Sequence, residues 1–154
     1  MPIPLNQWCD FLAAAQRTRG DRGGKANIGM TENEIATATL DVAFSIHRQY
    51  GPGLFESVYE ELFAYEWAKT GIGFLRQHPI PLIHETIVLD AGFRADFIIE
   101  DKVIIELKSV EKLMDVHFKQ VSTYLKLTEL KLGLLINFNA AYLKNGIHRI
   151  ANNL

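Results

Sequence analysis

The sequence predicts an α/β (α+β) domain, because the spacing of its apolar residues changes several times along the chain. Helical spacing runs first from Thr31 to Gly71 and returns over residues 116–127. Strand-like apolar runs occupy residues 74–110 between these segments and residues 131–138 after them. The expected order is helix, helix, three strands, helix, strand and a small terminal hairpin. A chain of 154 residues is long enough to bury one core in a single domain.

Two helices are expected at the start of this domain. Thr31 and Glu34 have the spacing of a capping box, in which the two side chains satisfy backbone N–H groups of the first helical turn. The Gly-Pro-Gly of residues 51–53 predicts the end of this helix. A second helix is expected over residues 54–69.

Three apolar runs separated by short polar joints predict an antiparallel meander, at residues 74–84, 87–99 and 102–110. Pro79 and Pro81 lack the N–H donor that a central strand needs, so they confine the first of these strands to a sheet edge.

The C-terminal part is expected to add one buried strand and a hairpin. Residues 131–138 are almost wholly apolar, which is typical of a strand covered on both faces. Asn145-Gly146 is a type I′ turn signal and predicts a turn that joins two short segments.

The first 30 residues differ in character from the rest. Residues 5–15 could form a short helix, and residues 17–25 are basic and glycine-rich, which is typical of a flexible linker. The predicted division is therefore an N-terminal extension at residues 1–30 and a compact domain at residues 31–154.

Composition limits where the protein is expected to work. No apolar run approaches the roughly 20 residues that span a bilayer, and the N-terminus lacks the pattern of a signal peptide. Cys9 is the only cysteine, so an internal disulfide and a cysteine-based zinc site are excluded. These features predict a cytoplasmic protein without a membrane partner.

Charge alone says little about nucleic acid, because the net charge is -2. Residues 101–154 carry eight basic and five acidic residues, so a phosphate-facing surface would lie in this final third. An ordinary solvated surface explains the same excess.

Three ionisable residues interrupt two apolar strands, namely Asp96, Glu106 and Lys108. A buried charge without a partner is energetically costly, so we expect these groups to interact with one another or with a ligand. If the apolar residues of both strands share one face, Phe97 pairs with Ile105 and Asp96 lies opposite Glu106. That register requires a three-residue joint or a bulge.

Two facing carboxylates repel each other and need a positive charge between or beside them. A Mg²⁺ or Mn²⁺ ion could be held by Asp96, Glu106 and the carbonyl oxygen of Leu107. Lys108 could then orient or deprotonate a water, or stabilise charge on a phosphoryl group. The alternative is a buried Asp–Lys–Glu cluster without a metal.

Two more side chains are candidates for the same site. Gln120 lies on the helical face that also carries His117, and it could hold a water or a phosphate oxygen. Glu56, at the start of the second helix, could be a third acid. Solvation of Gln120 and a favourable interaction of Glu56 with the helix dipole are the alternative roles.

Several separated motifs occur in one order along residues 31–151: Gly53-x-x-Glu56-x-x-Tyr59, Arg94-Ala95-Asp96, Ile105-Glu106-Leu107-Lys108, His117-x-x-Gln120, Gly133-Leu134-Leu135-Ile136-Asn137-Phe138 and Gly146-Ile147-x-Arg149-Ile150. In these motifs the chain resembles the GxxExxY protein family, a branch of the PD-(D/E)xK nuclease superfamily. The resemblance implies a restriction-endonuclease-like α-β-β-β-α-β core, with a central mixed sheet flanked by helices. Phe93 stands where members of the family often have Tyr.

The resemblance also assigns roles to residues. It implies that Asp96 is the metal-binding aspartate and that Glu106 and Lys108 are the (D/E)xK pair. Gln120 matches a glutamine on the following helix, and Glu56 matches the acid of the early helix. The implied function is metal-dependent hydrolysis of phosphodiester bonds in nucleic acid, in DNA rather than RNA.

Expected nucleic-acid contacts are the basic and polar residues around this site, Arg94, Lys112, His117 and Lys119. A non-catalytic binding module for nucleic acid or protein is the main alternative function, and an enzyme acting on a small phosphorylated molecule is a third. A homodimer or a partner protein would extend the small recognition surface of the domain.

Overall fold

The computed structural model describes residues 29–154. The helix expected at residues 5–15 and the linker expected at residues 17–25 lie outside the described part. The division at residue 30 therefore stays a prediction.

Three α-helices have the positions that the apolar spacing predicts: α2 (Glu32–Tyr50), α3 (Glu56–Ala68) and α4 (Asp115–Thr128). The capping box is present, because Glu34 N donates to Thr31 Oγ1 (3.2 Å) and Thr31 N donates to Glu34 Oε2 (2.7 Å). Gly51 ends α2 with a φ of 66°, a backbone conformation that favours glycine.

The main sheet is mixed and has five strands in the order β1-β4-β5-β6-β7. Its strands are β1 (Phe74–Pro79), β4 (Arg94–Ile99), β5 (Val103–Lys108), β6 (Leu132–Asn137) and β7 (Ile147–Ala151). β5 and β6 are parallel, and the other three pairings are antiparallel. Helix α4 makes the connection between the two parallel strands, as such a pair requires.

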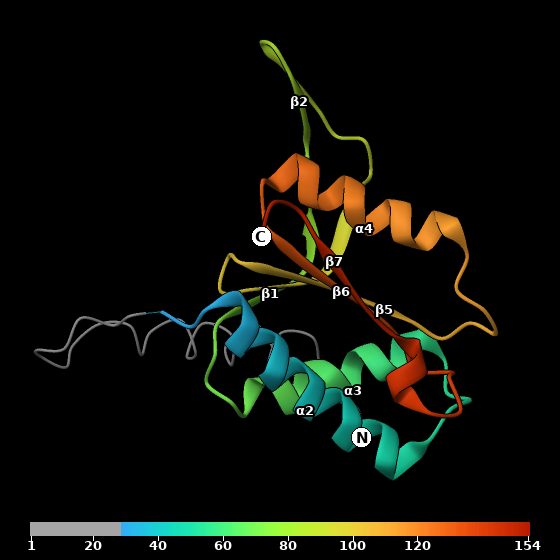
Figure 1. Ribbon diagram of the computed structural model, residues 1–154. Coiled ribbons are helices and arrows are strands. Elements are labelled where there is room, and N and C mark those ends of the chain that lie inside the picture. The colour runs from blue at the N-terminus through green and yellow to red at the C-terminus, as the bar shows by residue number, and fades with distance from the viewer. Residues whose placement is uncertain (1–28) are drawn as a thin grey trace, which may run out of the picture.

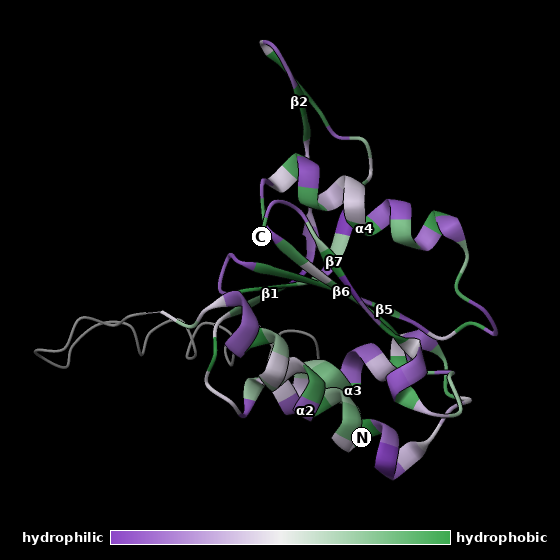
Figure 2. Ribbon diagram, viewed as in Figure 1, coloured by the Kyte–Doolittle hydropathy of each residue, from purple (hydrophilic) through white to green (hydrophobic). Residues whose placement is uncertain are grey.

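The sheet lies between two helical layers, with α2 and α3 on one face and α4 on the other (Figure 1). Each layer encloses a separate group of buried apolar side chains. Phe63, Trp67 and Phe97 belong to the core under α2 and α3, and Ile104 and Leu125 belong to the core under α4. The strands are mostly hydrophobic, while the helices alternate between hydrophobic and hydrophilic residues (Figure 2). This arrangement confirms the predicted α+β fold with a mixed sheet between helices.

The first two strand predictions were too long. Each run breaks into two strands, because the chain leaves the main sheet after β1 and forms a separate hairpin from β2 (Leu82–His84) and β3 (Ile87–Leu89). A hydrogen bond from Ile80 N to Phe93 O (2.9 Å) closes the base of this hairpin. Pro81 cannot donate to a ladder, so the main sheet cannot continue through it. β1 is an edge strand, as Pro79 and Pro81 predicted.

The predicted C-terminal hairpin was wrong. Asn145 and Gly146 lie in a short 3-10 helix (Leu143–Gly146), and β7 pairs with β6 instead of with a neighbouring terminal segment. The pairing satisfies backbone groups of β6 that would otherwise be buried without partners. Gly146 is required here because a Cβ atom would collide with the carbonyl oxygen of Asn137.

Candidate active site

The β4–β5 hairpin has the register that brings Asp96 to Glu106. Phe97 pairs with Ile105 and Ile99 with Val103, across a joint made of residues 100–102. The joint is closed by a hydrogen bond from Lys102 N to Ile99 O (2.9 Å). Continued by one residue, this pairing sets Asp96 opposite Glu106, as the apolar pattern predicted.

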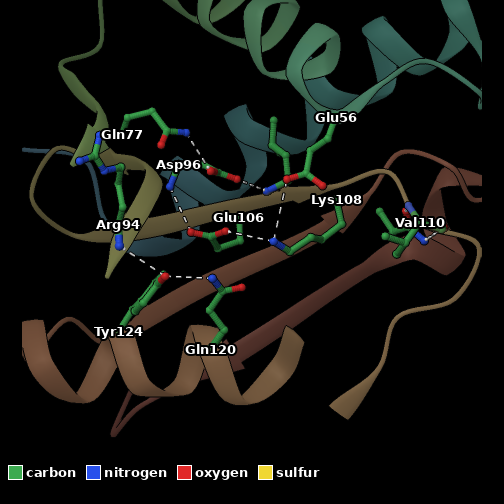
Figure 3. A network of polar contacts seen from close by, with 11 residues as sticks. Glu56, Gln77, Arg94, Asp96, Glu106, Lys108, Val110, Gln120 and Tyr124 are labelled. Atoms are coloured by element: carbon green, nitrogen blue, oxygen red, sulfur yellow. Dashed lines mark hydrogen bonds and ion pairs between the residues drawn. The ribbon is translucent and has the colours of Figure 1, made fainter. Parts of the chain in front are cut away.

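At Asp96 and Glu106, hydrogen bonds from backbone N–H groups to side-chain carboxylates replace the backbone–backbone hydrogen bonds of the strand pairing (Figure 3). Asp96 N donates to Glu106 Oε1 (3.1 Å), and Leu107 N donates to Asp96 Oδ2 (2.9 Å). A third donor, Gln77 Nε2 on β1, reaches Asp96 Oδ1 (3.1 Å). Each carboxylate is therefore held by a backbone N–H group of the opposite strand. These hydrogen bonds fix the side-chain rotamers and so the position of one carboxylate relative to the other.

Both acids are held where their charge is unfavourable. Glu106 is only 1% exposed, and burial together with the negative charge of Asp96 raises its pKa to about 9. Burial also raises the pKa of Asp96 above its ordinary value. Buried Glu106 and half-buried Asp96, both with raised pKa values, form a pair that an added positive charge would stabilise.

Lys108 lies between Glu106 and Glu56. Its Nζ is 3.8 Å from Glu106 Oε2 and 3.9 Å from Glu56 Oε1, and its side chain is 14% exposed. These distances are those of ion pairs rather than hydrogen bonds. The ammonium group is thus close to both acids without being tightly bound to either.

Glu56 is positioned by the loop that precedes α3. Tyr59 Oη donates to Gly51 O (2.5 Å) and accepts from Leu54 N (3.2 Å), so the tyrosine of the G-x-x-E-x-x-Y motif holds the loop. Ser109 Oγ donates to Leu54 O (2.6 Å) and ties the same loop to the end of β5. The start of α3 is therefore fixed beside Lys108.

Gln120 approaches from α4, on the opposite side of the carboxylates from Glu56 (Figure 3). Its Nε2 donates to Tyr124 Oη (2.9 Å), and this hydroxyl also accepts from Arg94 N (3.4 Å). Tyr124 thereby connects the predicted site helix to the beginning of β4, next to Asp96.

The structure does not bring the remaining predicted residues into this cluster. Arg94, Lys112 and Lys119 are exposed, as a role in contacting phosphates would require. His117 is half-buried, and its Nδ1 accepts from Met114 N (2.9 Å) at the start of α4. The structure gives His117 a capping role that its spacing did not predict.

Two residues of the site were missed from the sequence. Gln77 contacts Asp96 only because β1 pairs with β4, and no local pattern marks it. Tyr124 lies four residues after Gln120, and the helical spacing does place it on the same face, but no role was predicted for it.

The donor chemistry fits a hard divalent cation. Among residues 29–154 no group of three or more His, Cys, Asp and Glu side chains is arranged to hold a metal. A Mg²⁺ or Mn²⁺ ion does not need such a group, since one or two carboxylates with backbone, water and phosphate oxygens suffice. Asp96 and Glu106 supply the carboxylates. Leu107, whose N–H already points to Asp96, carries its carbonyl on the same side of β5.

Comparison with known families agrees with the fold. A family model described as the PD-(D/E)XK nuclease superfamily matches residues 33–150. The chain belongs to the PD-(D/E)XK nuclease superfamily, whose members generally use divalent metal ions and act on nucleic acid. Neither the curated proteins nor the solved structures contain a significant match. The narrower resemblance to GxxExxY proteins stays a prediction.

Within the described residues, no helix combines the length and the apolar character needed to cross a membrane.

Proposed function

We propose that this protein is a Mg²⁺- or Mn²⁺-dependent nuclease that hydrolyses phosphodiester bonds, with DNA as the substrate, and that residues 31–154 form its nuclease domain. The observation that carries the proposal is the pair of facing carboxylates, one buried and one half-buried, each fixed by the opposite strand's backbone, with Lys108 beside them. A pair that existed only for stability would not need two acids with raised pKa values facing each other.

In this proposal Asp96, Glu106 and the Leu107 carbonyl hold the ion. When bound, the ion supplies Lewis-acid stabilisation of phosphoryl charge and lowers the pKa of a water. The Lys108 ammonium orients the attacking water or stabilises negative charge on the phosphate. Glu56 keeps Lys108 positioned through their 3.9 Å ion pair.

Gln120 has the second positioning role. Its side-chain amide is oriented by the hydrogen bond to Tyr124, so it can present hydrogen-bonding atoms to a phosphate oxygen or a water. Arg94, Lys112, His117 and Lys119 would contact the nucleic acid outside the reacting phosphate.

A non-catalytic binding module is the second candidate, and one observation favours it. The described residues carry fewer Lys and Arg than Asp and Glu, although binding to a duplex depends mainly on neutralising phosphates. A module that only binds would not need the facing carboxylates, so we favour the nuclease.

The test is a cleavage assay on single-stranded, duplex and branched DNA and on RNA, with and without Mn²⁺. We expect wild-type cleavage that requires the metal, and a loss of at least about 100-fold in Asp96→Asn and in Lys108→Ala.

Asp101→Asn is the matched control, since Asp101 is an exposed acid in the joint of the same hairpin. It should cleave like the wild type. Cleavage that persists in both site variants would come from a contaminant or another site, and would refute the proposed mechanism.

A further inference from the structure

We propose that Phe55 stacks on a nucleobase and makes single-stranded nucleic acid the preferred substrate of this site. The inference rests on the proposed nuclease function, because it concerns what is held at the same carboxylates. Single-stranded binding sites characteristically combine an aromatic platform with a track for phosphates, and each stacked base adds affinity whatever the sequence.

The aromatic side chain of Phe55 is largely exposed to solvent. It is 83% exposed, more than any other large hydrophobic residue of the described chain. It immediately precedes Glu56, whose carboxylate is 3.9 Å from Lys108 Nζ. The ring lies one residue from Glu56 and belongs to neither buried core, so it is free to contact a ligand.

The position of Phe55 is fixed by its backbone rather than by its side chain. Phe55 O accepts from Val58 N (3.0 Å) and Tyr59 N (3.2 Å) at the start of α3. The preceding residue, Leu54, is held by Tyr59 and by Ser109 on the segment after β5. A ring on a rigid backbone loses little conformational entropy when a base stacks on it.

A second exposed apolar side chain comes just before α4. Met114, 57% exposed, is the N-cap residue of the helix that carries Gln120. Phe55 and Met114 thus immediately precede α3 and α4, the helices that carry Glu56 and Gln120. An unpaired base can place its ring against an exposed apolar side chain, whereas the faces of a base in a duplex are covered by its neighbours.

The charge distribution argues against a duplex. Residues 29–154 contain 12 Lys and Arg and 16 Asp and Glu. Helix α3 has four glutamates and no Lys or Arg, and Arg76 is engaged by two of them, Glu60 and Glu61. The second strand of a duplex, running along α3, would bring its phosphates close to acidic side chains. A single-stranded nucleic acid needs only the basic residues near α4.

The test compares wild type, Phe55→Ala and Phe55→Trp in Mn²⁺-dependent cleavage and in binding. The probes are fluorescently labelled oligonucleotides of about 12 nucleotides, as single-stranded DNA, single-stranded RNA and the matching DNA duplex. Binding by anisotropy uses the Asp96→Asn background to prevent turnover. Tyr65→Ala, which removes a 51% exposed ring farther along α3, is the matched control.

We expect wild type to prefer one of the single strands over the duplex. Phe55→Ala should raise KM and weaken single-strand binding on the order of ten-fold, with kcat little changed. Phe55→Trp should restore both, because indole also stacks, and Tyr65→Ala should behave as wild type. The DNA and RNA arms show which sugar the site accepts.

The possible failures are distinguishable. Cleavage by wild type that is unchanged in Phe55→Ala, or that favours the duplex, refutes the stacking role and leaves the nuclease function standing. No cleavage of any substrate, together with single-strand binding that needs Phe55, refutes the nuclease function and supports the stacking role. Binding that is equal in all variants refutes the inference whether or not cleavage occurs.

Discussion

At the scale of single residues, the site is a compromise between stability and chemistry. Asp96 and Glu106 accept hydrogen bonds from backbone N–H groups, which favours their charged forms. Burial acts more strongly in the other direction and raises both pKa values, helped by the charge of Glu60 at Asp96 and by the charge of Asp96 at Glu106. The folded protein without metal therefore tolerates this pair rather than being stabilised by it.

Asp96→Asn should stabilise the metal-free protein, by on the order of 1 kcal/mol. The substitution removes a buried charge and keeps an oxygen to accept from Leu107 N. Its amide N–H₂ group would face Gln77, whose own side-chain amide can rotate to present an oxygen. Thermal unfolding in a chelator should show a rise in Tm of about 3 °C.

Asp101→Asn serves as the comparison for this prediction, since it removes an exposed charge of the same type and should leave Tm unchanged. A lower Tm for Asp96→Asn would mean that the carboxylate stabilises the fold.

Tyr59→Phe should destabilise the fold by about 1 kcal/mol, because it removes one hydroxyl that bridges Gly51 O and Leu54 N. Urea unfolding measures the change. Tyr65→Phe removes a hydroxyl from a half-exposed ring on the same helix and should have no effect. Equal midpoints for all three proteins would show that the loop before α3 does not need the Tyr59 hydroxyl.

At the scale of elements, the β4–β5 hairpin builds the site, whereas the β2–β3 hairpin stands apart from it. In Figure 1 the second hairpin projects beyond α4, away from the sheet. Four of its larger apolar residues are exposed, namely Ile83, Ile87, Val88 and Leu89, and Leu82 is half-buried. Two three-residue strands with these exposures contribute little to the core.

Replacing residues 81–92 with Asn-Gly should therefore leave the fold intact. The new turn would join Ile80 and Phe93, which are already hydrogen-bonded. We expect a change in the free energy of unfolding within about 0.5 kcal/mol, measured by urea unfolding. A loss of several kcal/mol would show that the hairpin packs on the body of the protein.

At the scale of the whole molecule, the site exists because the sheet gathers distant segments. α3 brings Glu56, β1 brings Gln77, the central hairpin brings both acids, and α4 brings Gln120. Helices on both faces bury the hairpin and raise the pKa values of its acids. We therefore expect the metal to bind only the folded protein, in which these segments are brought together.

Added Mn²⁺ should raise the Tm of the wild type, since an ion that binds only the folded state stabilises it by about 2.7 kcal/mol at 100 times its Kd. For a chain of this size that corresponds to a shift of about 8 °C. Asp96→Asn should begin at a higher Tm and show no shift. An equal shift in both proteins would place the ion elsewhere.

Local patterns in the sequence predicted the α-helices of the described chain and the meeting of Asp96, Glu106 and Lys108, but not every strand. Apolar spacing predicted each helix, and the shared apolar face of β4 and β5 predicted the register that sets Asp96 opposite Glu106. These features are local, because they depend on periodicity and on residues joined by one short turn. Lys108 followed from Glu106 by the two-residue repeat of a strand.

The distant groups that contact Asp96, Glu106 and Lys108 depend on the tertiary structure. Gln77 reaches Asp96 through the β1–β4 pairing, and β7 pairs with β6 where a local hairpin was predicted. The separation of the β2–β3 hairpin from the main sheet is equally non-local. Such contacts form between strand edges and sheet faces that come from distant parts of the chain. A short stretch of sequence therefore does not predict them.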